Sequence, residues 1–230
     1  MKEVHDGLLR LRMLLSPTRA VLAELAGTAV LVMAVVGSGI CAQALTDDIG
    51  VQLLINALAT VAALGVLIVV LLPVSGAHLN PVVSGVLCAR GSISLRRCCA
   101  YAMAQVTGAV VGTVVAHGMY ERSAASTYGS ERGGAGQWLG EVVATSGLVL
   151  VVLVVDRTKV AIAVPAWIGA AYFMTSSTSF ANPAVTIGRA LTGSFSGIAW
   201  SDVPWFVVAQ LVGGGVALLL KPLLTTSETP

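Results

Sequence analysis

The chain has 230 residues, of which 56% are hydrophobic and only 10% are charged, and its formal net charge is +2. This composition excludes an ordinary soluble domain, and so small a net charge gives no reason to expect a nucleic-acid partner. The mean hydropathy of +0.89 instead predicts a protein of the lipid bilayer.

Six stretches are apolar and long enough to cross a bilayer, which takes roughly 20 residues each. They cover about 19–42, 51–73, 95–117, 137–155, 160–178 and 203–220. Residues 1–18 are expected to form an amphipathic cytoplasmic lead on the inner leaflet, and 222–230 a cytoplasmic tail. No small-residue cleavage site precedes the first stretch, so no cleaved signal peptide is expected.

Basic residues gather on one side of the membrane if the six spans alternate in direction. They are Lys2, Arg10, Arg12, Arg19, Arg90, Arg96, Arg97, Arg157, Lys159 and Lys221. Only Arg122, Arg132 and Arg189 fall on the other side. The positive-inside rule therefore predicts a multi-pass protein of the cell membrane with both termini in the cytoplasm.

Two Asn-Pro dipeptides, Asn80-Pro81 and Asn182-Pro183, stand in matching places, each after a long apolar stretch. Asn is a good helix N-cap, and Pro fits the first helical position because its missing N–H costs nothing there. Each dipeptide predicts a short helix that begins within the membrane, which is tolerated only where the backbone is buried or lines a watery path. A single Asn-Pro is an ordinary turn signal, so the pairing carries the prediction.

Three landmarks recur in the same order in both halves of the chain: a carboxylate, an Asn-Pro and a Gln-x-x-Gly. The carboxylates are Glu24 and Glu141, and the Gln-x-x-Gly runs begin at Gln105 and Gln210. Three spans per half give the halves opposite orientations. The pattern predicts an all-α inverted repeat of six transmembrane helices and two re-entrant half-helices, with one channel domain at 19–221 and repeats at about 19–117 and 137–221.

On these landmarks, and on the Ser-Gly-x-His-x-Asn-Pro loop that begins at Ser75, the chain resembles the major intrinsic protein family, the aquaporins and glycerol facilitators. The resemblance covers about residues 19–221. It implies a six-helix bundle whose half-helices meet at the centre, one pore per protomer, and a homotetramer. Its pore motifs are Asn80-Pro81-Val82, where Ala is usual in place of Val, and Asn182-Pro183-Ala184.

Elementary electrostatics agrees with such a pore. Two helix N-termini that meet place two positive dipole ends at the centre, which opposes cations and protons. The side-chain N–H groups of Asn80 and Asn182 would be offered to solute oxygens. The resemblance assigns Glu24 and Glu141 to loop support, with a proton relay as the alternative. It makes His78 a pore-facing residue, and a structural loop bond is the alternative.

The selectivity filter departs from the family pattern. The family usually has Arg directly after the second Asn-Pro-Ala, and this chain has Val185. Counting back without gaps from the two Asn residues places the other filter positions at Thr60, Ala170 and Ser179, or at Gly169 in place of Ala170. This set predicts a wide, uncharged filter. Arg189, one turn beyond Val185, could reach the vestibule, although capping the half-helix or meeting an interface is the favoured interpretation.

The stretch from Phe180 to Ile198 also resembles a bacterial aquaporin subgroup found with arsenic-resistance genes. The expected function is passive passage of small neutral solutes: arsenous acid, glycerol-like polyols and water. The open alternatives are a strict water channel, a coupled secondary transporter and a structural membrane protein. No nucleophile is paired with a base, and the His, Cys and carboxylate spacings suit no metal, so neither enzyme activity nor a cofactor is expected.

Overall fold

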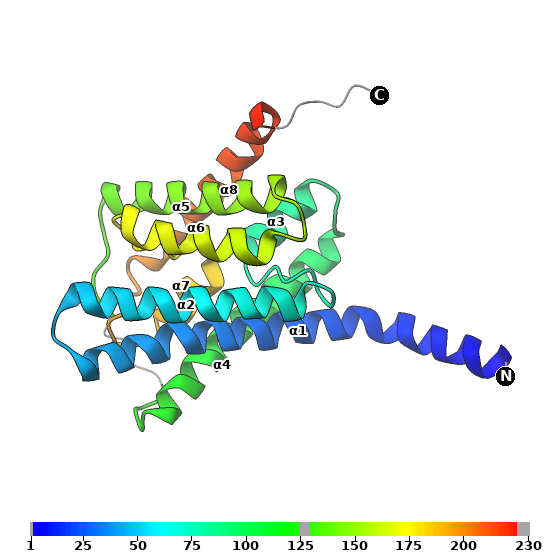
Figure 1. Ribbon diagram of the computed structural model, residues 1–230, viewed down its shortest axis with the longest axis horizontal. Helices are drawn as coiled ribbons and strands as arrows, with labels where there is room; N and C mark the ends of the chain where they lie inside the picture. The colour runs from blue at the N-terminus through cyan, green and yellow to red at the C-terminus, as the bar shows by residue number, and fades with distance from the viewer. Residues whose placement is uncertain (1, 125–128, 225–230) are drawn as a thin grey trace.

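The computed structural model describes residues 2–124 and 129–224, with side chains from residue 17 onward. All regular elements in these residues are helices (Figure 1). They are α1 (Lys2–Leu45), α2 (Ile49–Leu71), α3 (Pro81–Ala89), α4 (Leu95–Met119), α5 (Ala135–Val154), α6 (Val160–Met174), α7 (Pro183–Arg189) and α8 (Val203–Leu224). The predicted all-α membrane fold with two short inner helices is confirmed.

Five helices are long and apolar enough to cross a membrane: α1 from Pro17 onward, α2, α4, α5 and α8. The fifth predicted span, 160–178, is too long, because α6 ends at Met174 after 15 residues, a length of about 22 Å. The backbone becomes extended at Thr175 and continues as a loop to α7. α1 runs without a break through the expected boundary at residue 18, with Pro17 inside it. The side chains of the expected amphipathic lead lie outside the described residues.

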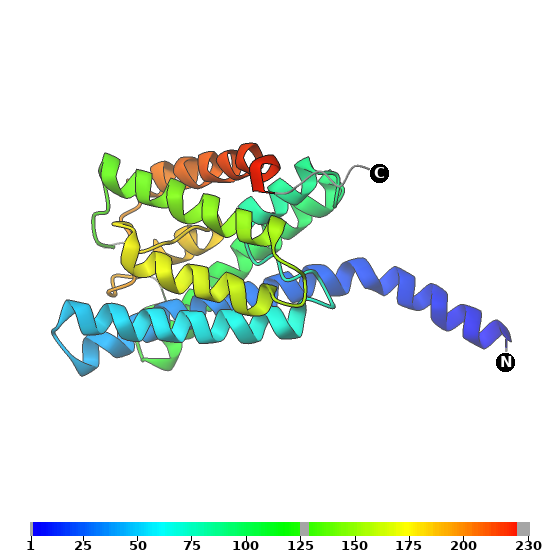
Figure 2. The same cartoon turned by 45° about the horizontal axis from the view of Figure 1, so that its top comes forward.

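The long helices pack as two similar sets. α1 packs against α4 in the first half and α5 against α8 in the second, and the contact of α2 with α6 joins the halves (Figures 1 and 2). Glycines of the Gln-x-x-Gly landmarks permit the close approach, since a Cβ on Gly213 would lie 2.7 Å from the carbonyl oxygen of Val142. A Cβ on Gly108 would lie closer still to the carbonyl oxygen of Leu25 in α1. Small residues at such crossings let helix backbones meet in a membrane.

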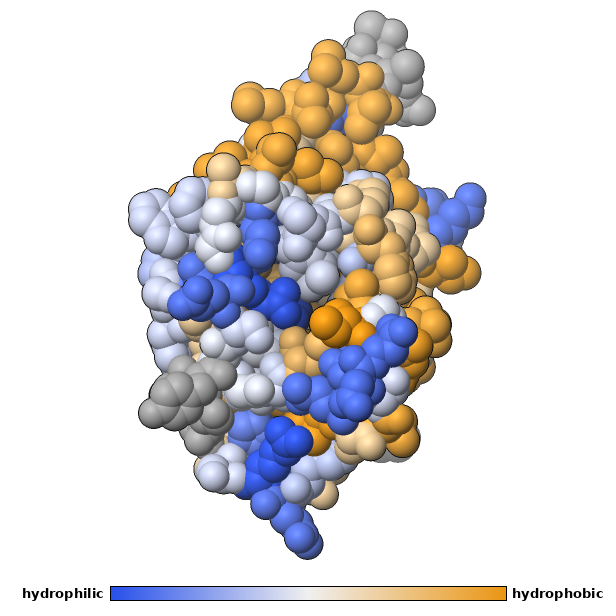
Figure 3. All heavy atoms as spheres, turned by 90° about the vertical axis from the view of Figure 1, so that its left-hand side faces the viewer, coloured by the Kyte–Doolittle hydropathy of each residue, from blue (hydrophilic) through white to orange (hydrophobic). Residues whose placement is uncertain are grey.

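The two short helices, α3 and α7, lie inside the frame of long helices, and each follows a loop that enters from one end (Figure 2). The end of the bundle that carries the α1–α2 connection has a largely polar surface, with apolar residues along its flank (Figure 3). The frame therefore places both half-helix N-termini in the middle of an otherwise apolar bundle.

Candidate channel site

The N-termini of α3 and α7 are capped by the two predicted Asn residues. Asn80 Oδ1 accepts a hydrogen bond from the backbone N of Val82 at 2.9 Å. Asn182 Oδ1 accepts from the backbone N of Ala184 at 3.0 Å and of Val185 at 3.3 Å. A Pro follows each Asn in the first helical turn. Both half-helices therefore begin as the sequence predicts, with their first N–H groups satisfied by a side chain.

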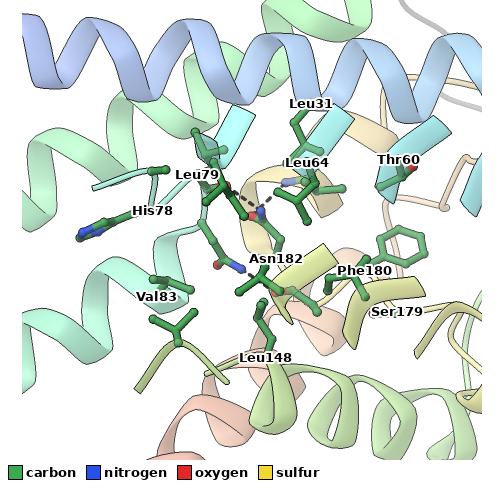
Figure 4. Close-up of a pocket in the computed structure, with 18 of the residues that line it drawn as sticks. Leu31, Thr60, Leu64, His78, Leu79, Val83, Leu148, Ser179, Phe180 and Asn182 are labelled. Atoms are coloured by element: carbon green, nitrogen blue, oxygen red, sulfur yellow. Dashed lines mark hydrogen bonds between the residues drawn. The ribbon is translucent and has the colours of Figure 1, made fainter. Parts of the chain in front are cut away.

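Each capping Asn also binds the opposite loop. Asn80 Nδ2 donates to the carbonyl oxygen of Ala181, and Asn182 Nδ2 donates to that of Leu79, both at 2.7 Å (Figure 4). Each Nδ2 carries two hydrogens, so one N–H of each Asn is left for another acceptor. The reciprocal bonds join the two repeats at the point where the half-helix N-termini meet.

Buried carboxylates hold the loops in place. Glu24, which is fully buried, accepts from the backbone N of His78 at 2.9 Å, from that of Leu79 at 2.6 Å and from Ser75 Oγ at 2.6 Å. Gln105 Nε2 donates to the same carboxylate at 2.8 Å. Two negative oxygens thus satisfy four donors that would otherwise be buried without a partner.

The second repeat uses the same arrangement. Glu141, also fully buried, accepts from the backbone N of Phe180 and of Ala181, both at 2.8 Å. Gln210 Nε2 donates to Glu141 at 2.6 Å and to Thr186 Oγ1 at 2.9 Å. The three landmarks of each half therefore form one hydrogen-bonded unit, which explains why they recur in the same order.

The loop backbones are unusual in both halves. Positive φ angles occur at the non-glycine residues Ala77 and Leu79 in the first loop and at Thr178, Ser179 and Ala181 in the second, all between 47° and 59°. This left-handed region costs an L-residue energy, so it persists only where the surroundings enforce it. The carboxylate bonds at the neighbouring N–H groups supply that enforcement.

A cavity of about 100 Å³ lies between the loops and the long helices (Figure 4). Its lining includes both capping Asn residues, with His78 towards one end and Thr60, Ser179 and Phe180 towards the other. Most of the remaining lining is aliphatic, from Leu31, Val35, Leu64, Ile68, Val83, Leu87, Leu148, Val152, Val160, Val164 and Ile168. An apolar passage with a few placed polar groups suits a small neutral solute.

Three of the predicted filter residues, Thr60, Ser179 and Val185, meet at this cavity. Ser179 Oγ is buried without a hydrogen-bond partner among the described residues. Thr60 Oγ1 accepts from the hydroxyl of Tyr172 at 3.0 Å. Tyr172, which the sequence analysis did not select, therefore belongs to the same ring of side chains.

The prediction of Ala170 as the fourth filter residue is wrong. Ala170 is exposed on the outer face of α6 and does not line the cavity, and Gly169 faces Val61 instead. α6 presents Ile168 and Tyr172 to the cavity, four residues apart on one helical face. Counting back without gaps places the filter residue on the wrong side of this helix.

Arg189 differs from the favoured interpretation. Its side chain is 1% exposed and lines the cavity. Its Cζ lies 3.3 Å from the centroid of the Phe180 ring, and its Nε donates to the carbonyl oxygen of Ser196. The predicted filter residues at the cavity are themselves uncharged, and Arg189, one turn beyond Val185, adds a charged side chain to the lining, as the alternative interpretation of this residue allowed.

The remaining predicted residues divide between the cavity and its support. The His78 ring lines the cavity and also bonds Ser84 Oγ through Nδ1 at 3.0 Å, so both roles considered for it are present. Val82 faces away from the cavity and packs with Val86, Val149 and Ala217. Pro183 and Ala184 are buried behind the cavity wall, and Pro81 is half-buried.

Cysteine and histidine side chains also occur elsewhere in the part of the chain that the structure describes. No group of three or more His, Cys, Asp or Glu residues there could hold a metal ion. Cys41, Cys88, Cys98 and Cys99 are free thiols. His117 is buried and its Nε2 shares a hydrogen bond with Thr192 Oγ1 at 2.9 Å.

Comparison with known proteins supports the resemblance to the major intrinsic protein family. The family model described as major intrinsic protein matches residues 12–176. The aquaglyceroporin AqpS of Rhizobium meliloti (strain 1021) is 47% identical over 93% of both chains, and aquaporin-1 of Homo sapiens is 30% identical over 88% of this chain and 80% of its own. A probable TIP-type aquaporin of Medicago truncatula is 32% identical over 92% of this chain and 88% of its own.

The fold agrees with a solved structure as well. The X-ray structure of the aquaglyceroporin from Plasmodium falciparum superposes with a TM-score of 0.69 at 25% identity, over 91% of this chain and 97% of that one. The family match, the extended relatives and the central pair of capped half-helices lead to one conclusion: the chain is a multi-pass membrane protein that belongs to the major intrinsic protein family.

Proposed function

We propose that the protein is a passive channel for small neutral hydroxylated solutes, among them glycerol-like polyols, arsenous acid and water. The observation that supports this most is the cavity that passes the two capping Asn residues between His78 and the Thr60–Ser179–Val185 group. Similarity to proteins named aquaglyceroporins agrees with it.

The chemistry of the lining favours neutral solutes. The spare Nδ2 hydrogens of Asn80 and Asn182 and the unpaired Ser179 hydroxyl can replace a few water hydrogen bonds of a polyol. An ion cannot recover its hydration energy from so few groups in an apolar wall. Arsenous acid is neutral at pH 7 and presents three hydroxyls, much like glycerol. Val185 in place of a long cationic side chain widens the passage at its own level.

A strict water channel is the second candidate, and one observation favours it. The Phe180 ring and the Arg189 side chain both line the outer part of the cavity, and two large side chains restrict it there. A coupled transporter fits less well, because the reciprocal Asn–carbonyl bonds at 2.7 Å hold the two repeats together at the centre.

Stopped-flow swelling of proteoliposomes tests these candidates with water, glycerol and arsenous acid on one preparation. The proposal requires all three permeabilities to exceed those of protein-free vesicles and flux to rise linearly with the gradient. Water permeability alone would establish the strict water channel. Saturable flux that depends on a proton or sodium gradient would establish a coupled transporter.

We further propose a homotetramer in a bacterial cell membrane with both termini in the cytoplasm. Exposed apolar side chains on α2 and α6, among them Val66, Val69 and Ile162, would then contact lipid or neighbouring protomers. Cross-linking in native membranes and labelling of single cysteines at the termini test the two parts separately.

A further inference from the structure

Two arginines from distant parts of the chain share one aromatic ring at the outer end of the cavity. Arg189 ends α7, and Arg132 lies in the connection between α4 and α5. Their Cζ atoms lie 3.3 Å and 5.2 Å from the centroid of the Phe180 ring. A guanidinium group within about 6 Å of a ring centroid is attracted to it, so the three side chains hold one another.

Neutral carbonyl groups orient this arginine pair, Arg132 and Arg189. Arg132 donates to the carbonyl oxygens of Gly197 at 2.8 Å and Phe195 at 3.2 Å, and Arg189 donates to that of Ser196. The nearby Asp202 carboxylate bonds the backbone N of Arg132 at 2.7 Å and not its guanidinium. Carbonyl acceptors fix the direction of both side chains, and the Glu141 carboxylate acts on both guanidinium groups without a hydrogen bond to either.

Burial strengthens the electrostatic effect of the two arginine charges on an ion in the cavity. Arg189 is 1% exposed, and Arg132 is half-buried. Burial lowers the pKa of Arg132 from its ordinary value, although an arginine stays protonated in proteins. Positive charge that is shielded from bulk water acts strongly on an ion in the adjoining cavity, because the effective dielectric constant there is low.

The arginine pair and the neutral filter residues are separate sets of side chains at one end of the cavity. α7 runs outward from the central Asn182, so the Arg189 backbone lies about 6 Å farther from the centre than Val185 at 1.5 Å per residue. Its guanidinium nevertheless lies on the Phe180 ring, so Arg189 lines the same end of the cavity as the uncharged ring of Thr60, Tyr172, Ser179 and Val185, and Arg132 adjoins this end through Phe180.

We infer that this pore divides its outer selectivity between two sets of side chains: the arginine pair opposes cations, and the uncharged ring limits the size of neutral solutes. The arrangement makes Arg132 a specificity-determining residue even though it comes from a connecting segment. The inference rests on the proposed channel function. It predicts that discrimination by charge and discrimination by size change independently on mutation.

Urea and guanidinium provide a matched pair of probes, because both are small planar molecules of similar size and only guanidinium is charged. The permeability of each is measured in proteoliposomes of the full chain, with Arg132→Gln compared with Arg132→Lys. Both variants lose the bidentate geometry of Arg, but only Gln loses the charge. Arg122→Gln is the control, because Arg122 is exposed and makes no contact with Phe180.

The guanidinium-to-urea permeability ratio of Arg132→Gln should exceed that of the unmodified protein about tenfold, since removing one unit charge at this range lowers the cation barrier by that order. Arg132→Lys and Arg122→Gln should keep the ratio within about twofold. The central barrier is common to all these proteins and cancels in the comparison. If Arg132→Gln does not assemble, Arg189→Gln against Arg189→Lys makes the same test.

An unchanged ratio in Arg132→Gln, with urea still conducted, would overturn the inference. So would an equal rise in Gln and Lys, which would assign the effect to the lost carbonyl bonds. An unmodified protein that conducts neither urea nor glycerol would contradict the channel function itself, so the two failures are distinguishable.

Discussion

In the first re-entrant loop His78 stands two residues before the capping Asn80, and in the second loop Phe180 stands in the equivalent place before Asn182. The backbone N of each donates to a buried glutamate: His78 to Glu24 at 2.9 Å and Phe180 to Glu141 at 2.8 Å. Their side chains have different surroundings. The His78 ring meets Ser84 and the edge of Tyr101, whereas the Phe180 ring meets two arginines.

The comparison shows that the two loops use different atoms for different tasks. Backbone N–H groups provide attachment to the scaffold, and because every residue except Pro has one, the scaffold is the same in both halves. Side chains are left free to set the chemistry of each mouth. The His78 end of the cavity is thus polar and aromatic, and the Phe180 end is aromatic and positively charged.

The shared scaffold can be broken most severely at its carboxylates. Glu141→Ala should prevent assembly or lower the unfolding temperature strongly, because three donors lose their acceptor and each buried unpaired donor costs about 1–3 kcal/mol. Glu141→Gln keeps one acceptor oxygen and should retain part of the stability and flux. Thermal unfolding in detergent and glycerol swelling measure both effects.

Glu24→Gln and Glu24→Ala are the matched pair in the first repeat and should behave in the same order. If Glu141→Gln abolishes flux in a protein that assembles normally, Glu141 acts by titration, and the proton-relay interpretation replaces the scaffold role.

The second-largest effect is expected from substitutions at the centre, where the two loops meet. Asn182→Asp replaces the Nδ2 donor to Leu79 by a carboxylate oxygen, so the bond at 2.7 Å is lost and negative charge is added at the helix N-terminus. We expect reduced glycerol flux and a measurable sodium leak, because the positive dipole ends no longer oppose cations. Unaltered glycerol flux and ion leak in both Asn182→Asp and Asn80→Asp would contradict a pore at this junction.

The parts of this arrangement that could be predicted from sequence are those that depend on local signals. Asn-Pro after an apolar stretch specifies a capped helix start whatever surrounds it, and the repeated order of Glu24, Asn80 and Gln105 in the second half reveals the shared scaffold. The starts of the two half-helices followed from these signals, whereas the second re-entrant segment begins earlier than predicted, at Thr175.

The filter residues could not all be predicted, because counting along the sequence does not show which face of a helix points to the cavity. A helix turns by about 100° per residue, so the shift of two residues from Ala170 to Tyr172 moves a side chain from the lipid face to the cavity. Arg132 lies in a connection without periodicity, and only the folded chain brings it to Phe180. Arg189 was assigned to a cap because its helix ends there, whereas its ring contact arises from a loop that precedes the helix.

Substitution of Val185 tests whether the filter residues at the Phe180 end set the size of the solutes that pass. Val185→Arg adds a long side chain with fixed N–H donors to the cavity lining. It should reduce glycerol and arsenous acid permeability about tenfold, through a barrier about 1.4 kcal/mol higher, and water permeability by less. The three permeabilities are measured on one vesicle preparation and normalised to protein content. An equal fractional loss for all three would show that Val185 does not set solute size.

The smallest effect is expected where the two motifs differ behind the cavity wall. Val82→Ala removes buried methyl groups that pack against Val86 and Val149 and should cost about 1–2 kcal/mol of stability without changing the glycerol-to-water ratio. Ala184 is 0% exposed in the equivalent place, so Ala184→Val should overpack and cost about 1–3 kcal/mol. Denaturation in detergent measures the loss of stability in Val82→Ala and in Ala184→Val. A changed permeability ratio in Val82→Ala would mean that this side chain reaches the pore.

The reciprocal Asn–carbonyl bonds also set an order of events during biosynthesis. Asn80 leaves the ribosome 101 residues before Ala181, the residue whose carbonyl it binds. At a synthesis rate of about 5–20 residues per second this separation corresponds to about 5–20 s. During that interval the residues of the first half-helix have been synthesised, but the Asn80 amide has no partner from the second repeat. The nascent first repeat therefore carries an open hydrogen-bonding position in the membrane until the second half-helix inserts beside it.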